Sequence, residues 1–268
     1  MTTATCALVI PARYESSRFP GKPLAPILGP GGARRPLIEW TWRAATAAAD
    51  GDRVFVATDD ARIADAVRAF GGAVLMTGPA CRNGTERIAA CLDRLEGTDI
   101  VVNVQGDALL TPPAFITALR AHMRAQPEAQ VATAAVRASA ETYRHLADDA
   151  AAGRVGGTTV VLDAAGRALY FSKRILPYLP EGRMPDADMP VLLHLGLYAY
   201  RRAALERYAA TGVTTLETVE GLEQLRFLVG GTPVDVLTFE ETGYPIVEVN
   251  NPTDIPLVEG IFSRRGTA

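Results

Sequence analysis

The chain of 268 residues has 27 Lys and Arg against 30 Asp and Glu, a formal net charge of -3, which argues against a dedicated nucleic-acid-binding protein. Its 48% hydrophobic and 21% charged residues are typical of a soluble globular domain, and no apolar run approaches the length of a membrane span. Three cysteines form no CxxC pair and no signal-peptide pattern is evident, so we expect reduced thiols and a cytoplasmic protein that binds neither nucleic acid nor membrane.

The first half of the sequence predicts strands that alternate with helices. Strands are expected at residues 6–10, 53–57, 73–76 and 99–104, and helices at 36–49, 58–70 and about 83–95. The run at 99–104 is apolar without alternation, as in a strand buried on both faces. This order predicts an α/β fold with a doubly wound, mostly parallel, Rossmann-like sheet.

The second half follows a less regular rhythm. A helix is expected at 112–125, a strand at 130–137, a hairpin with strands 158–162 and 168–172, a strand at 192–201, helices at 203–211 and 218–228, and a strand at 233–239. Residues 177–190 are rich in proline and charge and predict a surface excursion. No repeat or linker divides the chain, so we expect one domain over 1–268 with a small inserted subdomain at about 158–201.

The loop that follows the first strand, residues 11–24, is the most informative stretch. It carries Arg13, Arg18 and Lys22 together with Ser17 and a glycine. Cationic side chains and backbone N–H groups at a strand exit can wrap a polyphosphate. Neither a GxxxxGK[ST] string nor a GxGxxG string is present, so this is neither a Walker loop nor a dinucleotide fingerprint. The alternative is a solvated basic loop.

Two further polar segments follow predicted strands. Thr58-Asp59 and Gln105-Gly106-Asp107 each come at a strand end, where open parallel sheets bind ligands, so we expect them to meet the basic loop in one cleft. Asp107 is a hard-oxygen ligand suited to Mg²⁺. Its alternative role is to cap the helix that follows Pro112.

Seven segments, in this order, carry a resemblance to a known family. They are Pro11-Ala12-Arg13 through Ser17-Arg18-Phe19-Pro20-Gly21-Lys22-Pro23-Leu24, Ala57-Thr58-Asp59-Asp60, Asn83-Gly84-Thr85-Glu86-Arg87, Asn103-Val104-Gln105-Gly106-Asp107, Ala168-Leu169-Tyr170-Phe171-Ser172, His194-Leu195-Gly196-Leu197-Tyr198 and Leu222-Glu223-Gln224-Leu225-Arg226. Together they resemble the sugar-acid cytidylyltransferases, and most closely the 3-deoxy-manno-octulosonate (KDO) cytidylyltransferases. The spacing fits except for extra residues around 29–35.

The resemblance implies a nucleotidyltransferase fold and a homodimer that transfers CMP from CTP to a small anionic acid, with Mg²⁺ as cofactor and release of pyrophosphate. It assigns catalysis to Arg13, Lys22 and Asp107, and metal binding to Asp107 and Asn250. The nucleotide contacts it implies are Ala12, Arg13, Ser17, Arg18, Lys22, Thr58, Asp59, Asn83, Gly84, Thr85 and Gln105. The acceptor contacts it implies are Gln105, Lys173, His194, Glu223 and Gln224.

Without the resemblance, several of these residues have plainer interpretations. His194 lies in an apolar strand and would be a core histidine, and Asn83 would simply begin a helix. Glu220 and Gln224 would share one face of a solvated acidic helix, at i and i+4.

The chain also departs from the family pattern, chiefly where metal and acceptor would meet. Asn250 replaces the family's late metal-binding aspartate, Ala108-Leu109 replaces Glu-Pro, Leu193 replaces an arginine and Lys173 replaces another. A lost carboxylate weakens metal binding unless the acceptor brings extra negative charge, so phosphonoformate or another phosphonate is an alternative acceptor to KDO. Two more functions fit the same departures: a nucleotide-binding protein without catalysis, and a nucleotidyltransferase that uses a different nucleoside triphosphate.

Overall fold

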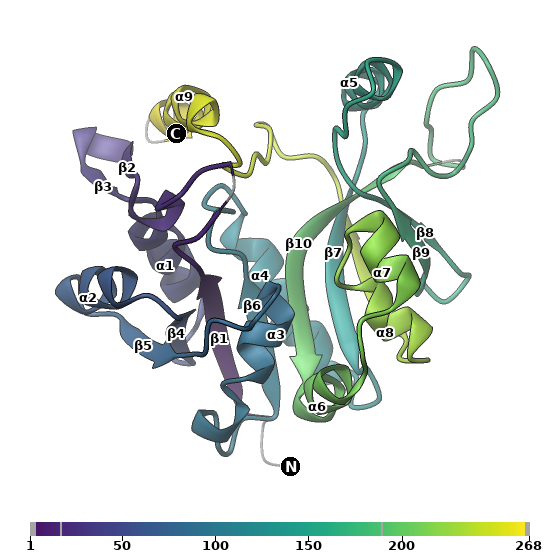
Figure 1. Cartoon of the computed structure of the whole chain (residues 1–268). Helices are drawn as coiled ribbons and strands as arrows, with labels where there is room; N and C mark the ends of the chain where they lie inside the picture. The colour runs from purple at the N-terminus through teal and green to yellow at the C-terminus, as the bar shows by residue number, and fades with distance from the viewer. Residues whose placement is uncertain (1–3, 17, 189, 266–268) are drawn as a thin grey trace.

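A computed structural model describes residues 4–16, 18–188 and 190–265, and a nine-stranded sheet runs through the centre of that part of the chain (Figure 1). The strands are β1 (Cys6–Ala12), β2 (Pro26–Leu28), β3 (Arg34–Pro36), β4 (Arg53–Thr58), β5 (Ala73–Met76), β6 (Ile100–Val104), β7 (Val131–Arg137), β8 (Thr159–Leu162), β9 (Ala168–Ser172), β10 (Leu192–Arg201) and β11 (Val234–Phe239). The helices are α1 (Leu37–Ala48), α2 (Ala61–Ala69), α3 (Gly84–Ala89), α4 (Pro113–Ala125), α5 (Ala140–Ala151), α6 (Arg202–Ala210), α7 (Thr215–Glu220), α8 (Leu225–Val229) and α9 (Ile255–Arg265).

The main sheet has the order β11-β7-β10-β6-β1-β4-β5, with the β8–β9 hairpin attached to β10. β1 runs parallel to both β4 and β6, β4 is parallel to β5, and β11 is parallel to β7, whereas β10 is antiparallel to its neighbours β6 and β7. The expectation of a mostly parallel α/β sheet is therefore confirmed. β10 reverses direction because the chain reaches it through a hairpin and a surface excursion rather than through a crossover helix.

Both faces of this sheet are buried, which explains the unbroken apolar strands. Along β1, Leu8 and Ile10 pack into one core with α1, α2 and α4, while Ala7 and Val9 pack into a second core with α3, α6 and α8. The strand ends of β1 and β6 thus come to lie at the same edge, between helices on both faces (Figure 1).

A third, smaller core lies beyond that edge. The β2–β3 hairpin, the start of α1 and helix α9 enclose it, and the backbone of Leu28 donates to Glu259 of α9 at 2.8 Å (Figure 1). Ala108 and Leu109 are buried next to this core, so the residues that replace the family's Glu-Pro serve packing. Val249 is fully buried in the same core and anchors the segment before α9.

Several elements differ from the sequence expectations, and β2, β3 and α9 were not predicted. The helix expected at 218–228 is two helices, because Gly221 adopts a left-handed conformation (φ 63°) and ends α7. The helix expected at 83–95 ends at Ala89 and is followed by a short 3₁₀ turn. β1 continues through Pro11, because only its backbone acceptor is needed there, and α5 has no counterpart in the predicted elements.

The hairpin formed by β8 and β9 joins the main sheet through β10. The excursion that follows contains no helix or strand within residues 173–188. The assignment of 158–201 to a subdomain for dimerisation stays a prediction. Within the described ranges, no helix is both long and apolar enough to cross a bilayer.

Candidate active site

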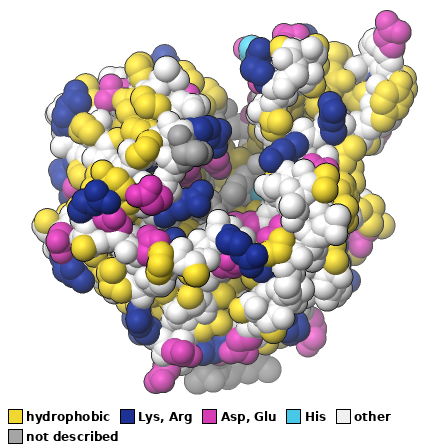
Figure 2. Space-filling view, viewed as in Figure 1, with side chains coloured by type: hydrophobic (Ala, Val, Ile, Leu, Met, Phe, Trp, Pro, Cys, Tyr) yellow, Lys and Arg dark blue, Asp and Glu magenta, His cyan; other side chains and the backbone are white. Residues whose placement is uncertain are grey.

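A cavity of about 230 Å³ opens where β1 and β6 end. Figure 2 shows the surface hollowed on this side, with Lys and Arg side chains gathered along the hollow. The predicted site residues that line the cavity are Ala12, Arg13, Arg18, Lys22, Asn83, Gly84, Gln105, Asp107 and Asn250. Segments that lie far apart in the sequence therefore meet at this edge of the sheet.

The loop between β1 and the next turn supplies the cations of the cavity. Arg13 and Arg18 are exposed at its rim, and Lys22 is half-buried with its ammonium on Asp107. A backbone bond of 2.9 Å from Gly21 N–H to the carbonyl of Tyr14 closes the loop. Ser17, which was predicted to contact the nucleotide, lies outside the described residues.

Two further arginines line the cavity and were not among the predicted contacts. Arg82 is exposed and Arg87 is buried, and both belong to the segment that starts α3. Arg87 forms an ion pair of 3.3 Å with Asp59, so Asp59 orients this cation from behind the wall and does not line the cavity itself.

Two other residues that were predicted to contact the nucleotide, Thr58 and Thr85, are fully buried. The hydroxyl of Thr58 accepts from the backbone of Asp60 at 3.2 Å, and that of Thr85 bonds to the hydroxyl of Tyr200 at 2.9 Å. Neither side chain lines the cavity. In this structure they fix the β4 exit and the start of α3, and their role as nucleotide contacts stays a prediction.

Asn83 and Gly84 form the part of this wall that faces the cavity. The Asn83 side chain caps α3 by accepting from the backbone of Glu86 at 2.8 Å, and it donates to Tyr208 at 3.1 Å. A Cβ on Gly84 would lie 3.1 Å from both the Gln105 amide nitrogen and the ring of Pro11. A side chain at this position would press on Gln105 and Pro11 where β1, β6 and α3 meet, which favours glycine.

Oxygen donors gather at one end of the cavity. Asp107 and Asn250 both line it, the Asn250 amide oxygen accepts from Arg18 at 3.3 Å, and Val249 N–H donates to the Asp107 carbonyl at 3.3 Å. Across the described ranges, no three His, Cys, Asp or Glu side chains gather to hold a metal by themselves. Such a set still fits Mg²⁺, which takes one or two carboxylates and completes its shell with phosphates and water.

Glu248 is a carboxylate of this region that sequence reasoning missed. Burial, and secondly the nearby charge of Asp107, raise its pKa from 4.5 to about 7, against the opposing effects of Lys22, Asn250 and Arg18. The available signal was the alternation Val247-Glu248-Val249-Asn250, which places residues 248 and 250 on one side of an extended segment.

The predicted acceptor residues other than Gln105 do not line the cavity. His194 bonds to the Thr133 hydroxyl at 2.9 Å and packs edge-on against Phe171, and burial lowers its pKa to about 3. It is therefore a neutral imidazole at physiological pH. Lys173 is exposed, and its ammonium lies 2.7 Å from where a Cβ on Gly221 would be, at the carboxyl end of α7.

Glu223 and Gln224 lie at the turn between α7 and α8. Glu223 accepts from the backbone N–H of Thr85 at 3.1 Å, and burial raises its pKa to about 7 despite that bond. Gln224 is buried, and its amide nitrogen has no hydrogen-bond partner among the described residues. Glu223 therefore contacts the start of α3, whose N-cap is Asn83.

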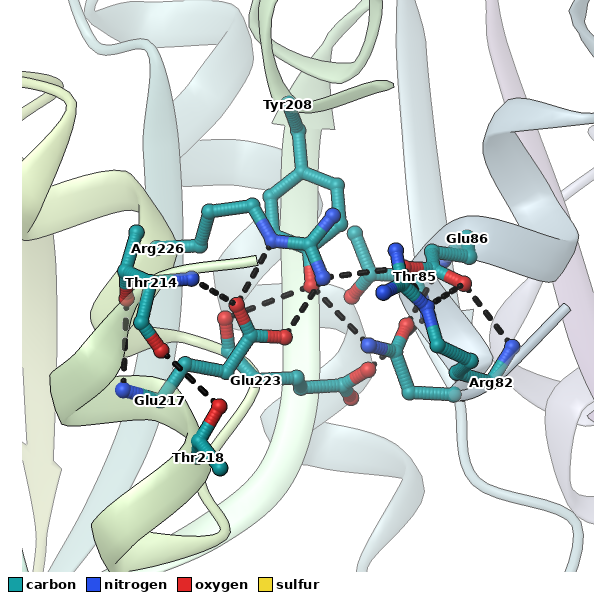
Figure 3. A network of polar contacts seen from close by, with 10 residues as sticks. Arg82, Thr85, Glu86, Tyr208, Thr214, Glu217, Thr218, Glu223 and Arg226 are labelled. Carbon is teal, nitrogen blue, oxygen red and sulfur yellow. Dashed lines mark hydrogen bonds and ion pairs between the residues drawn. The ribbon is translucent and has the colours of Figure 1, made fainter. Parts of the chain in front are cut away.

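A buried ion network ties this turn to α3 (Figure 3). Arg226 bonds to both carboxylate oxygens of Glu217 at 2.5 and 2.8 Å and to Glu86 at 2.9 Å, and it stacks 4.0 Å above the ring of Tyr208. Burial acts to raise the pKa of Glu86, but hydrogen bonds from Arg82 and Arg226 outweigh it and lower the value to about 2. The interpretation of this helix as a solvated acidic face is wrong, because Glu217 is buried on Arg226 and Gly221 separates Glu220 from Gln224.

Comparisons with known proteins agree with this arrangement. A family model described as cytidylyltransferase matches residues 7–236. A 3-deoxy-manno-octulosonate cytidylyltransferase of Maricaulis maris is 48% identical over 96% of this chain and 97% of its own. This chain belongs to the 3-deoxy-manno-octulosonate cytidylyltransferase family.

Solved structures extend this family assignment to the fold. A CMP:2-keto-3-deoxy-manno-octonic acid synthetase in complex with CTP superposes with a TM-score of 0.83 at 35% identity, covering 98% of this chain and 100% of that one. A 4-diphosphocytidyl-2C-methyl-D-erythritol synthase of Anaerococcus prevotii, 14% identical with a TM-score of 0.59 over 96% of each chain, shares the fold. The chain is a nucleotidyltransferase of the cytidylyltransferase class, as the sequence resemblance implied.

Proposed function

We propose that this enzyme transfers CMP from CTP to KDO and releases pyrophosphate. The observation that carries the proposal is the cavity at the ends of β1 and β6, where Arg13, Arg18 and Lys22 face a carboxylate. The relative at 48% identity is named for this acceptor, and the similar structure at 35% identity is a complex with CTP. Both support the proposal for this chain.

The basic loop would hold the triphosphate. Arg13 and Arg18 can donate from the rim, and Lys22 can exchange the Asp107 carboxylate for phosphate oxygens on the floor of the cavity. Arg87, fixed by Asp59, adds a cation on the side of α3. Such a set stabilises the extra negative charge of phosphoryl transfer by position alone, so no covalent enzyme intermediate is needed.

We further propose Mg²⁺ as cofactor, held by Asp107 with the amide oxygen of Asn250. The ion would supply charge neutralisation at the phosphates that react and leave. The carboxylate and amide oxygens at this end of the cavity are the hard ligands that Mg²⁺ prefers.

The acceptor would enter from the β10 side. Gln105 links the two sides, because its side chain lies against both Gly84 at the α3 start and Gly196 in β10. The neutral His194, Glu223 and the unpaired amide of Gln224 offer hydrogen bonds suited to a polyhydroxy acid. These groups would orient an acceptor oxygen toward the α-phosphate of CTP.

KDO is preferred over a phosphonate for a reason seen in the structure. The phosphonate hypothesis rested on the missing carboxylate at position 250, and the structure places Glu248 close enough to Asp107 to act on it electrostatically. A second negative charge is thus available from the protein. The comparisons give the phosphonate alternative no support.

Pyrophosphate release with CTP and Mg²⁺ tests the proposal, with KDO and phosphonoformate as acceptors and with UTP or GTP in place of CTP. We expect release only with CTP and KDO. Release with phosphonoformate alone would make this a phosphonate enzyme, and tight CTP binding without release from any acid would make it a nucleotide-binding protein.

We also propose that the enzyme is a homodimer. Leu169 on β9, Val219 on α7 and Val229 on α8 are exposed apolar side chains, and β9 is bonded on one edge only within the described sheet. A second copy packed here would cover the exposed apolar side chains and the open edge of β9. Light scattering on the eluting protein should give twice the chain mass, and a monomer at micromolar concentration would contradict the proposal.

A further inference from the structure

The segment that leads into the third core presents Glu248 and Asn250 on the same side. Val249 is fully buried and Val247 packs against that core, so the residues between and after them face away from it. Asn250 indeed lines the cavity. Glu248 therefore lies on the same side of the segment as Asn250 and outside the core, although it does not itself line the cavity.

Backbone pairing fixes Glu248 beside Asp107. Val249 N–H donates to the Asp107 carbonyl at 3.3 Å, so residues 248 and 250 flank the loop that carries this carboxylate. One oxygen of Glu248 lies 3.3 Å from where a Cβ on Gly196 would be, and the side chain of Gln105 reaches within 3.1 Å of the same point. The Glu248 carboxylate thus lies between the Asp107 loop and β10.

The two cations that act on Glu248 are bonded to other groups. Lys22 pairs with Asp107 and Arg18 bonds to Asn250, whereas the hydrogen bond to Glu248 comes from the neutral Asn250 side chain. Lys22 neutralises only one of these two neighbouring, half-buried carboxylates, and the second is costly without a counter-ion of its own. A divalent cation between them would relieve both.

We propose that Glu248 is the second carboxylate ligand of the divalent cation held by Asp107, in place of the aspartate that the family has at position 250. The inference rests on the proposed function, because the cation is the one that accompanies CTP. Moving the carboxylate two residues along an extended segment keeps it on the same side and restores the charge that Asn250 lacks. Asn250 then bonds to Glu248 and orients it.

The test compares CTP affinity by calorimetry in saturating Mg²⁺ and in EDTA. In Glu248→Gln, the factor by which Mg²⁺ strengthens CTP binding should fall about tenfold or more. Affinity in EDTA should stay equal or rise, because a negative charge near the triphosphate is removed. A residue that only supports the fold would weaken binding in both conditions.

Two further variants sharpen the result. Glu248→Gln combined with Asn250→Asp returns a carboxylate to the position usual in the family and should recover most of the Mg²⁺ effect. Glu240→Gln alters an exposed carboxylate that pairs with Arg137 and should change neither affinity. A Glu248→Gln enzyme with an unchanged Mg²⁺ effect, or a double variant no better than the single one, would overturn the proposal. Failure of the unaltered enzyme to bind CTP in either condition would instead defeat the proposed function.

Discussion

The two walls of the site are built on opposite principles. On the side of β1, the groups that would bind the nucleotide are cations on a loop, exposed or half-buried. On the side of α7 and α8, the charged and polar groups are buried and already bonded, Glu217 to Arg226 and Glu223 to the start of α3. The cations of the loop can exchange their present partners for a ligand, whereas the buried groups near α7 and α8 keep the same hydrogen bonds before and after binding.

Substitutions in the two regions should therefore affect different properties, activity in the first and stability in the second. Removing a cation from the loop should weaken binding and turnover but leave the fold intact, because little else depends on it. Removing a member of the buried network should unfold part of the protein, because its partners are left unpaired in a low dielectric. Four substitutions test this, from the largest expected effect to the smallest.

Asp107→Asn should have the largest effect on activity. With the carboxylate that would hold the cation neutralised, kcat/KM for CTP should fall about 10³-fold, or about 4 kcal/mol in transition-state stabilisation. Pyrophosphate release measures this. Asp65→Asn, which alters an exposed carboxylate on α2, is the control and should match the unaltered enzyme. Equal turnover by Asp107→Asn and its control would show that Asp107 holds no cation that catalysis needs.

Arg226→Ala should have the largest effect on stability. It leaves Glu217 and Glu86 without their buried partner, which costs about 3–5 kcal/mol of unfolding free energy. Urea denaturation measures this loss. Arg82→Ala removes the exposed partner of the same Glu86 and should cost far less unfolding free energy. Similar losses in the two variants would show that burial does not distinguish these arginines.

Arg13→Ala should affect activity and leave stability unchanged. Losing a donor to the triphosphate should lower kcat/KM for CTP about 10²-fold, or about 2.7 kcal/mol, without moving the thermal midpoint. Steady-state kinetics and a melting curve together check both halves. Arg34→Ala, an exposed arginine on the β2–β3 hairpin, serves as the control. A thermal midpoint that falls in Arg13→Ala but not in Arg34→Ala would show that Arg13 stabilises the fold, contrary to this prediction.

Glu223→Gln should change how stability depends on pH. Burial raises the pKa of Glu223 from 4.5 to about 7, so between these values the folded state holds a proton that the unfolded state releases. The contribution of this group to stability is therefore present below pH 4.5 and is lost as pH rises through 7. Denaturation of both proteins at these two ends should show the variant gaining about 2 kcal/mol relative to the unaltered enzyme. A difference that is the same at both ends would contradict the assignment of a buried, protonated Glu223.

The sequence predicted most of the sheet because its strands are mainly apolar and many end at polar residues. It failed where single residues decide the outcome. Gly221 looked like a tolerated glycine inside a helix pattern but adopts a left-handed conformation and divides the helix. α5 was missed because only Leu146 on it is buried, so it has no apolar stripe to detect.

The site was predictable at the level of segments and less so for individual side chains. Strand ends located the cavity, because all parallel strands present their carboxyl ends at one edge. The position of a strand end does not show which way each side chain points. Thr58 and Thr85 are buried, whereas Arg82 and Arg87 line the cavity. Glu248 belongs to no motif; the alternation of residues 247–250 was its one sequence signal, and the pairing of Val249 with Asp107 is what places it beside that carboxylate.

The central claim is that the loop after β1 holds the triphosphate of CTP opposite a cation on Asp107. Crystals of the enzyme grown with CTP and Mn²⁺ test it most directly, through the anomalous scattering of the metal. The account predicts a metal peak beside the Asp107 carboxylate, with the triphosphate against Arg13 and Lys22. A nucleotide bound elsewhere, or a metal peak remote from Asp107, would contradict it.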